Sequence, residues 1–393
     1  MTVFIQHSYG KSDKIVNSIE KDLTSGVIFS PKGESTPMKM IETIKEYTEM
    51  GVRTYFDPHF QLGLIENCPD SKIKDYPYYK SSLKYKDFVS PKNLLQHVNT
   101  CLNFQKNLNV TGLISPTCII ESFEDKWCGV SMQMAQGALE YASENNVAEL
   151  YITFVISDNA FLGSKDSLDD FITTITSFDN LDKIYLIINK SLEAYSPQIE
   201  SDKLQNILYL IYSLSVWNNI KIICGYSDII GLTYLSAGAE AITTGWSQKS
   251  RFFCRGNYKE MHGGSLPKPR YMSLPLLNSI NITPELNQIK SFGLIDKVLS
   301  GTEYDNLIIQ TPVAENWSQV SFYHHINSLN LCSKNLLLYE VDKRIEIMQT
   351  RIEHAIELYN ELKSIGVPFA QHTNDTHLYQ WRIALDSFKE MIQ

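Results

Sequence analysis

Short runs of β-branched and aromatic residues alternate with longer amphipathic segments over most of the chain. Seven runs have strand character: residues 26–30, 52–58, 109–117, 149–157, 183–189, 220–226 and 239–244. Helices are expected between them at residues 36–50, 91–107, 131–145, 168–178, 202–217 and 229–236. Because consecutive parallel strands need a crossover connection, this alternation predicts a parallel sheet covered by helices on its faces.

We expect the repeated units to form a TIM-like (β/α)8 barrel of the α/β class, with an N-terminal extension and a C-terminal helical region. The barrel is assigned to residues 1–280, and residues 281–393 to the helical region packed on it. An eighth strand is not evident, and Tyr271–Leu277 is the candidate. In the C-terminal region, Tyr339–Ser364 has apolar positions at helical spacing and precedes Gly366, which predicts a long helix.

The composition narrows the class of protein. The seven cysteines are scattered, with no CxxC pair and no Cys/His cluster at zinc spacing, so we expect buried thiols, no metal site and no cofactor. No window reaches the roughly 18 apolar residues of a membrane span, and the N-terminus lacks a signal-peptide pattern. These features predict a cytoplasmic protein without a membrane partner.

A basic segment, residues 249–270, departs from the net charge of -9 of the whole chain. It holds six Lys or Arg residues against one acid, Glu260. Such a cluster suits a polyanion, and the loops that follow barrel strands form the active face of this fold. A solvated loop without a ligand is the alternative interpretation.

Carboxylates follow several of the strands. In residues 52–57 the side chains of Arg53, Tyr55 and Asp57 share one face, which we expect to point into the barrel and to place Asp57 at its mouth. Asp158 and Glu121 follow two other strands and could converge with Asp57 to divide acid and base roles. Each could instead cap a turn or begin a helix.

Three other strand-end residues have weaker signals. Asp228 is interpreted as a helix N-cap. His59 could carry a proton or contact a phosphate. Trp246 could stack on a flat ligand or be buried against a helix.

The strand-end segments resemble those of tRNA-guanine transglycosylases. Phe56–Gln61 (FDPHFQ) resembles that family's DSGGFQ segment, whose Asp assists at the nucleobase. Gly225 and Tyr226, with the glycine and leucine that follow in GYSDIIGL, resemble the family's GYAIGGL loop, which contacts the base. Residues 238–251 occupy the place of a GVDMFDCVMPTR-like segment that carries the nucleophilic Asp and then arginines near the nucleic acid.

The departures from the family are chemically informative. The position that resembles the nucleophilic Asp falls near Thr243, the glycines of DSGGFQ are missing after Asp57, and the CxCxxC zinc site is missing as well. Without the covalent nucleophile, base exchange gives way to hydrolysis with water as the acceptor. Some relatives of the family act on DNA in DNA-modification and phage-related gene sets, so the resemblance implies a distant, zinc-less, DNA-acting relative.

The leading hypothesis is therefore a nucleic-acid N-glycosylase that removes a modified base from DNA, with phage defence as the setting that the resemblance suggests. The target base would be flipped into the barrel mouth. The residues assigned to it are, for catalysis, Asp57, Asp158 and Glu121; for the base, Gln61, Gly225, Tyr226 and Trp246; and for phosphates, Lys249, Arg251, Arg255, Lys268 and Arg270. The alternatives are a barrel lyase, aldolase or isomerase on a small phosphorylated substrate, a base-exchange transglycosylase, and a catalytically silent binding or defence component.

Overall fold

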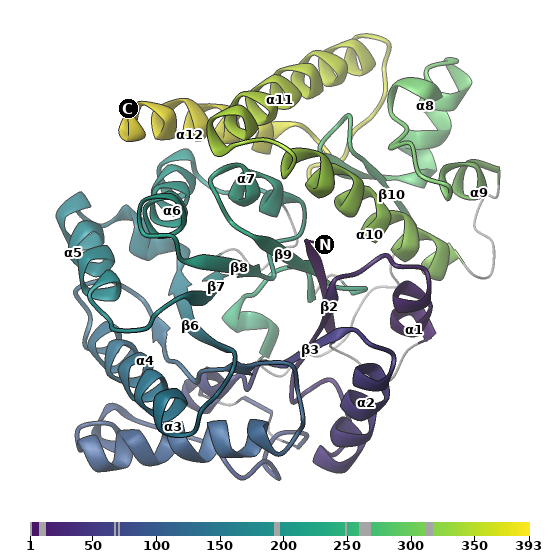
Figure 1. Ribbon diagram of the computed structural model, residues 1–393. Helices are drawn as coiled ribbons and strands as arrows, with labels where there is room; N and C mark the ends of the chain where they lie inside the picture. Colours follow the sequence, from purple (N-terminus) through teal and green to yellow (C-terminus); the bar gives the residue numbers. More distant parts are fainter. Residues whose placement is uncertain are drawn as a thin grey trace.

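The computed structural model describes residues 2–7, 13–66, 68–69, 71–191, 197–247, 250–258, 269–310 and 317–393. Within these residues, eight parallel strands form a nearly closed barrel surrounded by helices (Figure 1). The strands are β1 (Val3–His7), β2 (Gly26–Phe29), β3 (Arg53–Phe56), β4 (Leu113–Ile114), β6 (Leu150–Ser157), β7 (Lys183–Asn189), β8 (Lys221–Gly225) and β9 (Ala241–Thr244). A short strand, β5 (Ile119–Ile120), also pairs with β6.

The barrel is closed between β3 and the segment that leads into β4. Tyr55 and Gly112 form a parallel bridge there, and the Thr111 backbone N–H donates to the Thr54 carbonyl at 2.8 Å. Gly112 is required at this point, because a Cβ atom would lie 3.0 Å from the Tyr55 ring and 2.9 Å from the Glu149 side chain. The neighbouring strands follow chain order, and β1 lies between β2 and β9.

Seven helices connect the barrel strands on the outside (Figure 1). They are α1 (Asp13–Glu20), α2 (Pro37–Glu49), α3 (Pro91–Lys106), α4 (Lys126–Glu144), α5 (Lys165–Thr176), α6 (Ser201–Tyr212) and α7 (Gly231–Ser236). The helices expected from the sequence are confirmed, although α4 begins five residues earlier than expected because Asp125 caps it by accepting from the Trp127 N–H. The barrel is the expected TIM-like α/β fold.

The eighth strand is β1, and this corrects two expectations. The N-terminal residues form the first barrel strand and not an extension. The candidate Tyr271–Leu277 is not in the barrel: β10 (Arg270–Ser273) pairs antiparallel with β11 (Asn278–Asn281) in a separate hairpin. Strand β1 has only three apolar residues followed by Gln6 and His7, too few to show a period, which explains why the sequence pattern did not reveal it.

Strand parity divides the core in two. Phe4, Tyr55, Tyr151 and Tyr185 belong to a cluster inside the barrel. Their chain neighbours, such as Phe56, belong to the larger cluster between the strands and the helices. The expected inward face of β3 is thereby confirmed for Tyr55.

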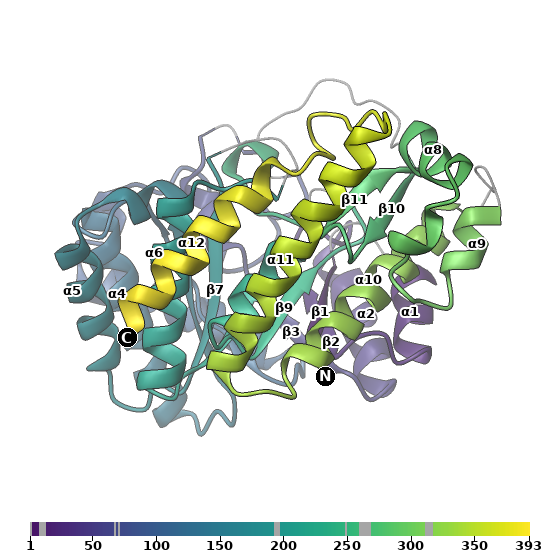
Figure 2. The same cartoon turned by 90° about the horizontal axis from the view of Figure 1, so that it is seen from above.

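The C-terminal region is helical and lies against one side of the barrel (Figures 1 and 2). It contains α8 (Asn287–Ser291), α9 (Asp305–Gln310), α10 (Trp317–Leu336), α11 (Val341–Ser364) and α12 (Thr376–Ile392). Helix α10 contacts α1, α7 and β1, so it takes the place of the eighth barrel helix. Helix α11, expected from its periodicity, packs on α7, and α12 packs on α6. No helix in the described part of the chain is both long enough and apolar enough to cross a membrane.

The close approach of β2 to β3 gives a stability prediction. A Cβ atom at Gly26 would lie 2.2 Å from the Arg53 backbone carbonyl oxygen, so Gly26→Ala forces the strands apart and should destabilise the fold by about 1–3 kcal/mol. The matched control is Gly129→Ala on the exposed face of α4, where a Cβ meets nothing within 4 Å and should stabilise the helix by roughly 0.5–1 kcal/mol. Urea unfolding of the two variants measures the difference, and equal free energies of unfolding would contradict this account of the barrel.

Candidate active site

The inward-facing residues near the carboxyl ends of the strands form a polar layer above the apolar barrel interior. The Gln6 amide of β1 donates to the Tyr185 hydroxyl of β7 at 2.6 Å and to the Thr243 hydroxyl of β9 at 3.0 Å. The Thr243 oxygen also accepts from the Tyr226 backbone N–H at 2.6 Å. Asp57, which follows β3, completes the layer. Three of the eight strands are thus tied together across the mouth.

Asp57 and His59 form a buried acid–base pair in this layer. They are 2% and 1% exposed. One Asp57 oxygen accepts from the His59 backbone N–H at 3.0 Å, and the other lies 3.3 Å from His59 Nε2. The same Nε2 lies 2.8 Å from the Tyr226 hydroxyl. His59 has a left-handed backbone with φ of 48°, a strained conformation that these contacts hold in place.

Two tyrosines supply hydroxyl groups beside Asp57. Burial, and then the charge of Asp57, raise the pKa of Tyr185 well above its ordinary value. Burial, followed by Tyr258 and Asp57, does the same to the pKa of Tyr226. Both hydroxyls therefore stay protonated at neutral pH and can donate. Gly225 makes room for Tyr185, because a Cβ atom there would lie 2.7 Å from its ring.

The segment Ser250–Tyr258, which follows β9, covers the mouth. Phe253 forms a parallel bridge with Asn189, and its carbonyl accepts from the Lys190 N–H at 2.9 Å. Phe253 is fully buried in the cluster inside the barrel. The Tyr258 ring meets His59 edge-on at 5.5 Å between centroids. We name residues 250–258 the covering segment.

The other two predicted carboxylates lie in different surroundings. Both oxygens of Asp158 accept from Ser191, at 3.1 and 2.9 Å, and Lys203 of α6 lies 3.8 Å away. Glu121 pairs with Arg255 of the covering segment at 2.7 Å, with both side chains about two-fifths exposed. Among the described residues, no hydrogen bond or ion pair joins either carboxylate to Asp57. These contacts therefore do not bring Asp158 and Glu121 together with Asp57. The catalytic roles assigned to the three carboxylates remain predictions.

Asp228 is not the helix cap expected from the sequence. It begins the 3-10 turn Asp228–Ile230 without capping it, because Ser227 occupies the cap position and Asp228 has φ of 49°. Its carboxylate lies 2.6 Å from His325 Nε2 of α10 and accepts from the Thr244 hydroxyl at 2.6 Å. Burial opposes the charge of Asp228, but His325, Arg251 and Thr244 together lower its pKa below the ordinary value.

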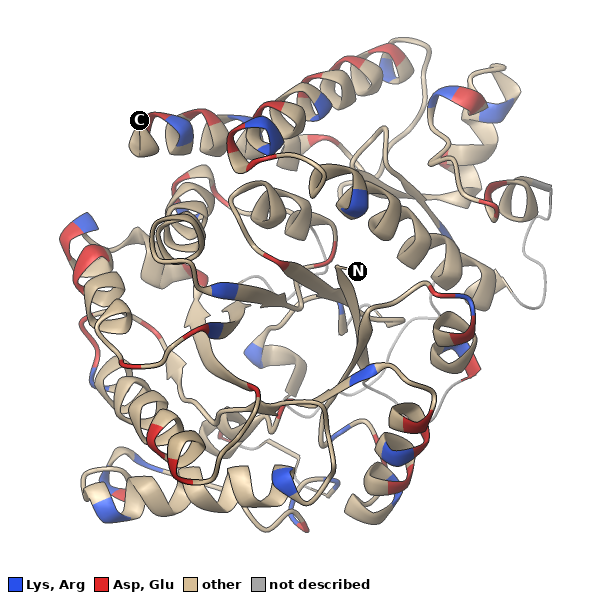
Figure 3. Cartoon of the chain, in the orientation of Figure 1, with Lys and Arg blue, Asp and Glu red and all other residues tan. Residues whose placement is uncertain are grey.

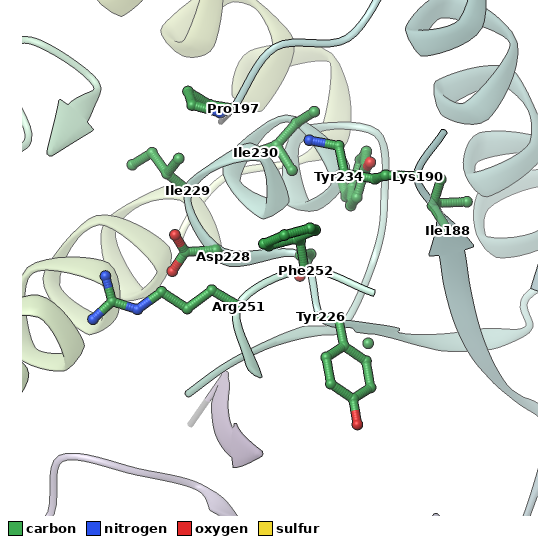
Figure 4. Close-up of a pocket in the computed structure, with 12 residues that line it drawn as sticks. Ile188, Lys190, Pro197, Tyr226, Asp228, Ile229, Ile230, Tyr234, Arg251 and Phe252 are labelled. Atoms are coloured by element: carbon green, nitrogen blue, oxygen red, sulfur yellow. The ribbon is translucent and has the colours of Figure 1, made fainter. Parts of the chain in front are cut away.

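A small pocket of about 20 Å3 adjoins this pair, large enough for roughly one water molecule. Lys190, Asp228 and Arg251 line it, while the Tyr226 ring points away from it (Figure 4). Burial lowers the pKa of Lys190 to about 8, although Asp158 and Asp228 act in the opposite direction. Lys190 follows β7 one residue after the inward-facing Asn189, so the pocket lies outside the barrel wall.

The remaining predicted ligand contacts are dispersed. Arg251 donates to the Gly245 carbonyl at 2.9 Å, Arg255 pairs with Glu121, and Arg270 begins β10. Lys249 and Lys268 lie outside the described residues. On the outer helices, for example α2 and α11, basic and acidic residues are interspersed (Figure 3).

Two predicted base contacts differ in their setting. The Trp246 ring lies under the Lys14 ammonium group, 4.4 Å from its centroid, on the α1 side of the barrel. Gln61 is buried in the 3-10 helix Phe60–Leu64, and its amide nitrogen has no hydrogen-bond partner among the described residues. No group of three or more His, Cys, Asp or Glu side chains in the described ranges could hold a metal ion.

Comparisons with known proteins give distant similarities to solved structures. No family model matches the chain, and no curated protein matches it. A glycoside hydrolase family 3 β-N-acetylglucosaminidase from Paenibacillus sp. str. FPU-7 aligns over 90% of this chain and 67% of its own, with 9% identity and a TM-score of 0.43. A fungal multi-domain β-N-acetylglucosaminidase of the same family aligns over 88% and 42%, with 10% identity and a TM-score of 0.41. Similarities this distant transfer no residue's role.

The buried Asp228–His325 pair predicts a pH-dependent stability. Both groups have a lowered pKa in the folded protein, that of His325 because of burial and Arg251. The unfolded state therefore binds more protons, and stability should fall as the pH drops below about 6.5 and again below about 3.8. Asp228→Ala leaves the buried His325 and Thr244 donors unpaired and should destabilise the protein by about 1–3 kcal/mol for each donor at pH 7. Denaturant unfolding between pH 3 and 8 measures both effects. A loss below 1 kcal/mol would show that the pair is incidental.

Proposed function

We propose that this protein is a glycosidase that hydrolyses the N-glycosidic bond of a base in a nucleic acid, with DNA favoured over RNA. The observation that carries the proposal is the buried Asp57 carboxylate, held at the barrel mouth by His59 and surrounded by tyrosine hydroxyls and aromatic rings. A carboxylate in this setting can stabilise an oxocarbenium-like sugar or orient water, and the imidazole can move a proton. Flat rings such as Tyr226, Phe253 and Tyr258 suit a planar base.

The absence of a carboxylate at Thr243 supports hydrolysis over base exchange. The Thr243 hydroxyl oxygen accepts two hydrogen bonds, from Gln6 and from the Tyr226 backbone, and so is committed to holding the layer together. A covalent glycosyl-enzyme intermediate needs a nucleophile that can approach the sugar carbon. A water molecule is then the nucleophile, and the products are a free base and an abasic site.

A second candidate function rests on the pocket beside Asp228. Lys190 and Arg251 line that pocket from the loops that follow β7 and β9. Phosphate groups in barrel enzymes are commonly bound between the last two strand-end loops. This favours, as the alternative, a lyase, aldolase or isomerase on a small phosphorylated substrate.

The proposed chemistry predicts that Asp57→Asn abolishes turnover without unfolding the protein. The change keeps the size of the side chain but removes its charge, so base release should fall by about two to four orders of magnitude. The measurement is release of free base and of alkali-labile abasic sites from normal and hypermodified phage DNAs. Borohydride should trap no protein–DNA adduct.

The control variant is Asp305→Asn. Asp305 is also a buried carboxylate, but its partners are Tyr271 and Thr302 in the C-terminal region. This variant should lower the melting temperature and keep turnover. Normal turnover of Asp57→Asn, or no abasic sites in any DNA tested with the wild type, would overturn the proposal.

Nucleic-acid binding by the arginines assigned to phosphates predicts a salt dependence that other surface cations do not share. Replacing Arg251, Arg255 and Arg270 with Ala should weaken DNA binding and reduce the slope of log K against log salt by about one for each lost phosphate contact. A control with the same charge change replaces Lys39, Lys45 and Lys343, which are exposed on α2 and α11. Fluorescence anisotropy of labelled DNA at several salt concentrations measures both. Equal effects of the two triple variants would mean that the arginines make no specific contact.

A further inference from the structure

We infer that the Tyr258 side chain occupies a binding pocket for a flat heteroaromatic ring and leaves it when that ring enters. The inference rests on the proposed function only in identifying the ring as a nucleobase. It adds the location of the ring, the residues that contact it, and the element that must move.

The surroundings of Tyr258 are those of a bound ring. Phe253 lies 5.3 Å from its centroid at an interplanar angle of 37°, and His59 lies at 5.5 Å, nearly perpendicular at 86°. The Lys32 ammonium group lies 5.2 Å above the ring. His59, whose ring contacts Tyr258, also contacts the Tyr226 ring at 6.1 Å, so Tyr258 lies beside the hydroxyl-bearing layer. A tilted ring, an edge contact, a cation and polar groups at one edge are contacts that a planar base can use in place of the phenol.

Buried polar atoms without partners point to a ligand in the same layer. Gln6 Oε1 and His59 Nδ1 have no hydrogen-bond partner among the described residues, although both side chains are at most 1% exposed. Leaving such an atom unpaired is unfavourable by roughly 1–3 kcal/mol. Gln6 is fixed in the mouth by its bonds to Tyr185 and Thr243. A polar heteroaromatic ring in place of the Tyr258 phenol could form hydrogen bonds with these two atoms.

Access to Asp57 requires this displacement. Asp57 and His59 are almost fully buried, while Tyr258 is only half-buried and belongs to the 3-10 turn Arg255–Tyr258 of the covering segment. That turn is held by the Arg255–Glu121 ion pair, in which both side chains are about two-fifths exposed. Exposed pairs of this kind contribute only about 0–1 kcal/mol. Little of the turn's stability therefore comes from this ion pair, whereas Phe253 is anchored on β7 through its backbone, so Tyr258 is the ring that we infer to move.

The test is the affinity of free bases for Tyr258 variants. The probes are adenine, guanine, cytosine, thymine and their nucleosides, measured by isothermal titration calorimetry. Tyr258→Ala removes the competing ring, so at least one base should bind about tenfold or more tightly than to the wild type, and Tyr258→Phe should behave as the wild type. Glu121→Gln, which removes the ion pair, should tighten binding by at most about fivefold. Tyr85→Ala, on a partly exposed tyrosine that packs on Trp127, is the control and should change nothing.

Hydrogen exchange gives a second readout, which would not change if Tyr258 were a permanent wall of the pocket. When a base binds the wild type, the Arg255 amide, which donates to Asn189 Oδ1, should exchange faster as the turn Arg255–Tyr258 loosens, while the Lys190 amide, which donates to the anchored Phe253 carbonyl, should not change. Weaker or unchanged binding in Tyr258→Ala would show that Tyr258 is a wall and overturn the inference. Tighter binding without any abasic product would sink the proposed function alone. Abasic product with unchanged base affinity would sink the inference alone.

Discussion

Closure of the barrel is the constraint on which the rest of the structure depends. The sheet would be open if β3 did not meet the segment before β4, and the contact consists of a few hydrogen bonds around Thr54, Tyr55 and Gly112. Closure brings the carboxyl ends of all eight strands into one ring. It also puts Tyr55, Tyr151 and Tyr185 inside, where their rings fill the space and leave only the upper polar layer for chemistry.

A one-residue offset along each strand separates two kinds of strand-end site. Thr243 faces inward and joins the Asp57 layer, whereas its neighbour Thr244 faces outward and bonds to Asp228. In the same way, Asn189 faces inward and Lys190 faces outward. Inward groups are held by other strands, and outward groups by helices, as His325 of α10 holds Asp228. The two sites share the barrel rim and are built from different layers of the protein.

The sequence was sufficient for the features that depend on local pattern. Apolar runs and the helices between them predicted the barrel, and period-two alternation predicted the inward face of β3 that carries Asp57 toward the mouth. Features set by contacts between distant residues could not be predicted. Asp228 looked like a helix cap because its neighbours in sequence suggested a turn, while its partner His325 lies 97 residues away. The pairing of Glu121 with Arg255 likewise could not be predicted from the sequence. Gln6 was not predicted as a site residue because the strand that carries it, β1, was not predicted.

The position of β1 and α10 has a consequence for how the chain folds during synthesis. Strand β1, which precedes the other barrel strands in the sequence, lies between β2 and β9, and its outer side is covered by α10. A nascent chain emerges from its N-terminus, so β1 keeps one unpaired edge until residue 244 has appeared and a bare apolar side until residue 336 has. Of the eight barrel strands, β1 is thus the one whose second neighbour lies farthest along the sequence. Its exposed edge makes the half-made chain, more than the finished protein, the species that depends on protection from aggregation.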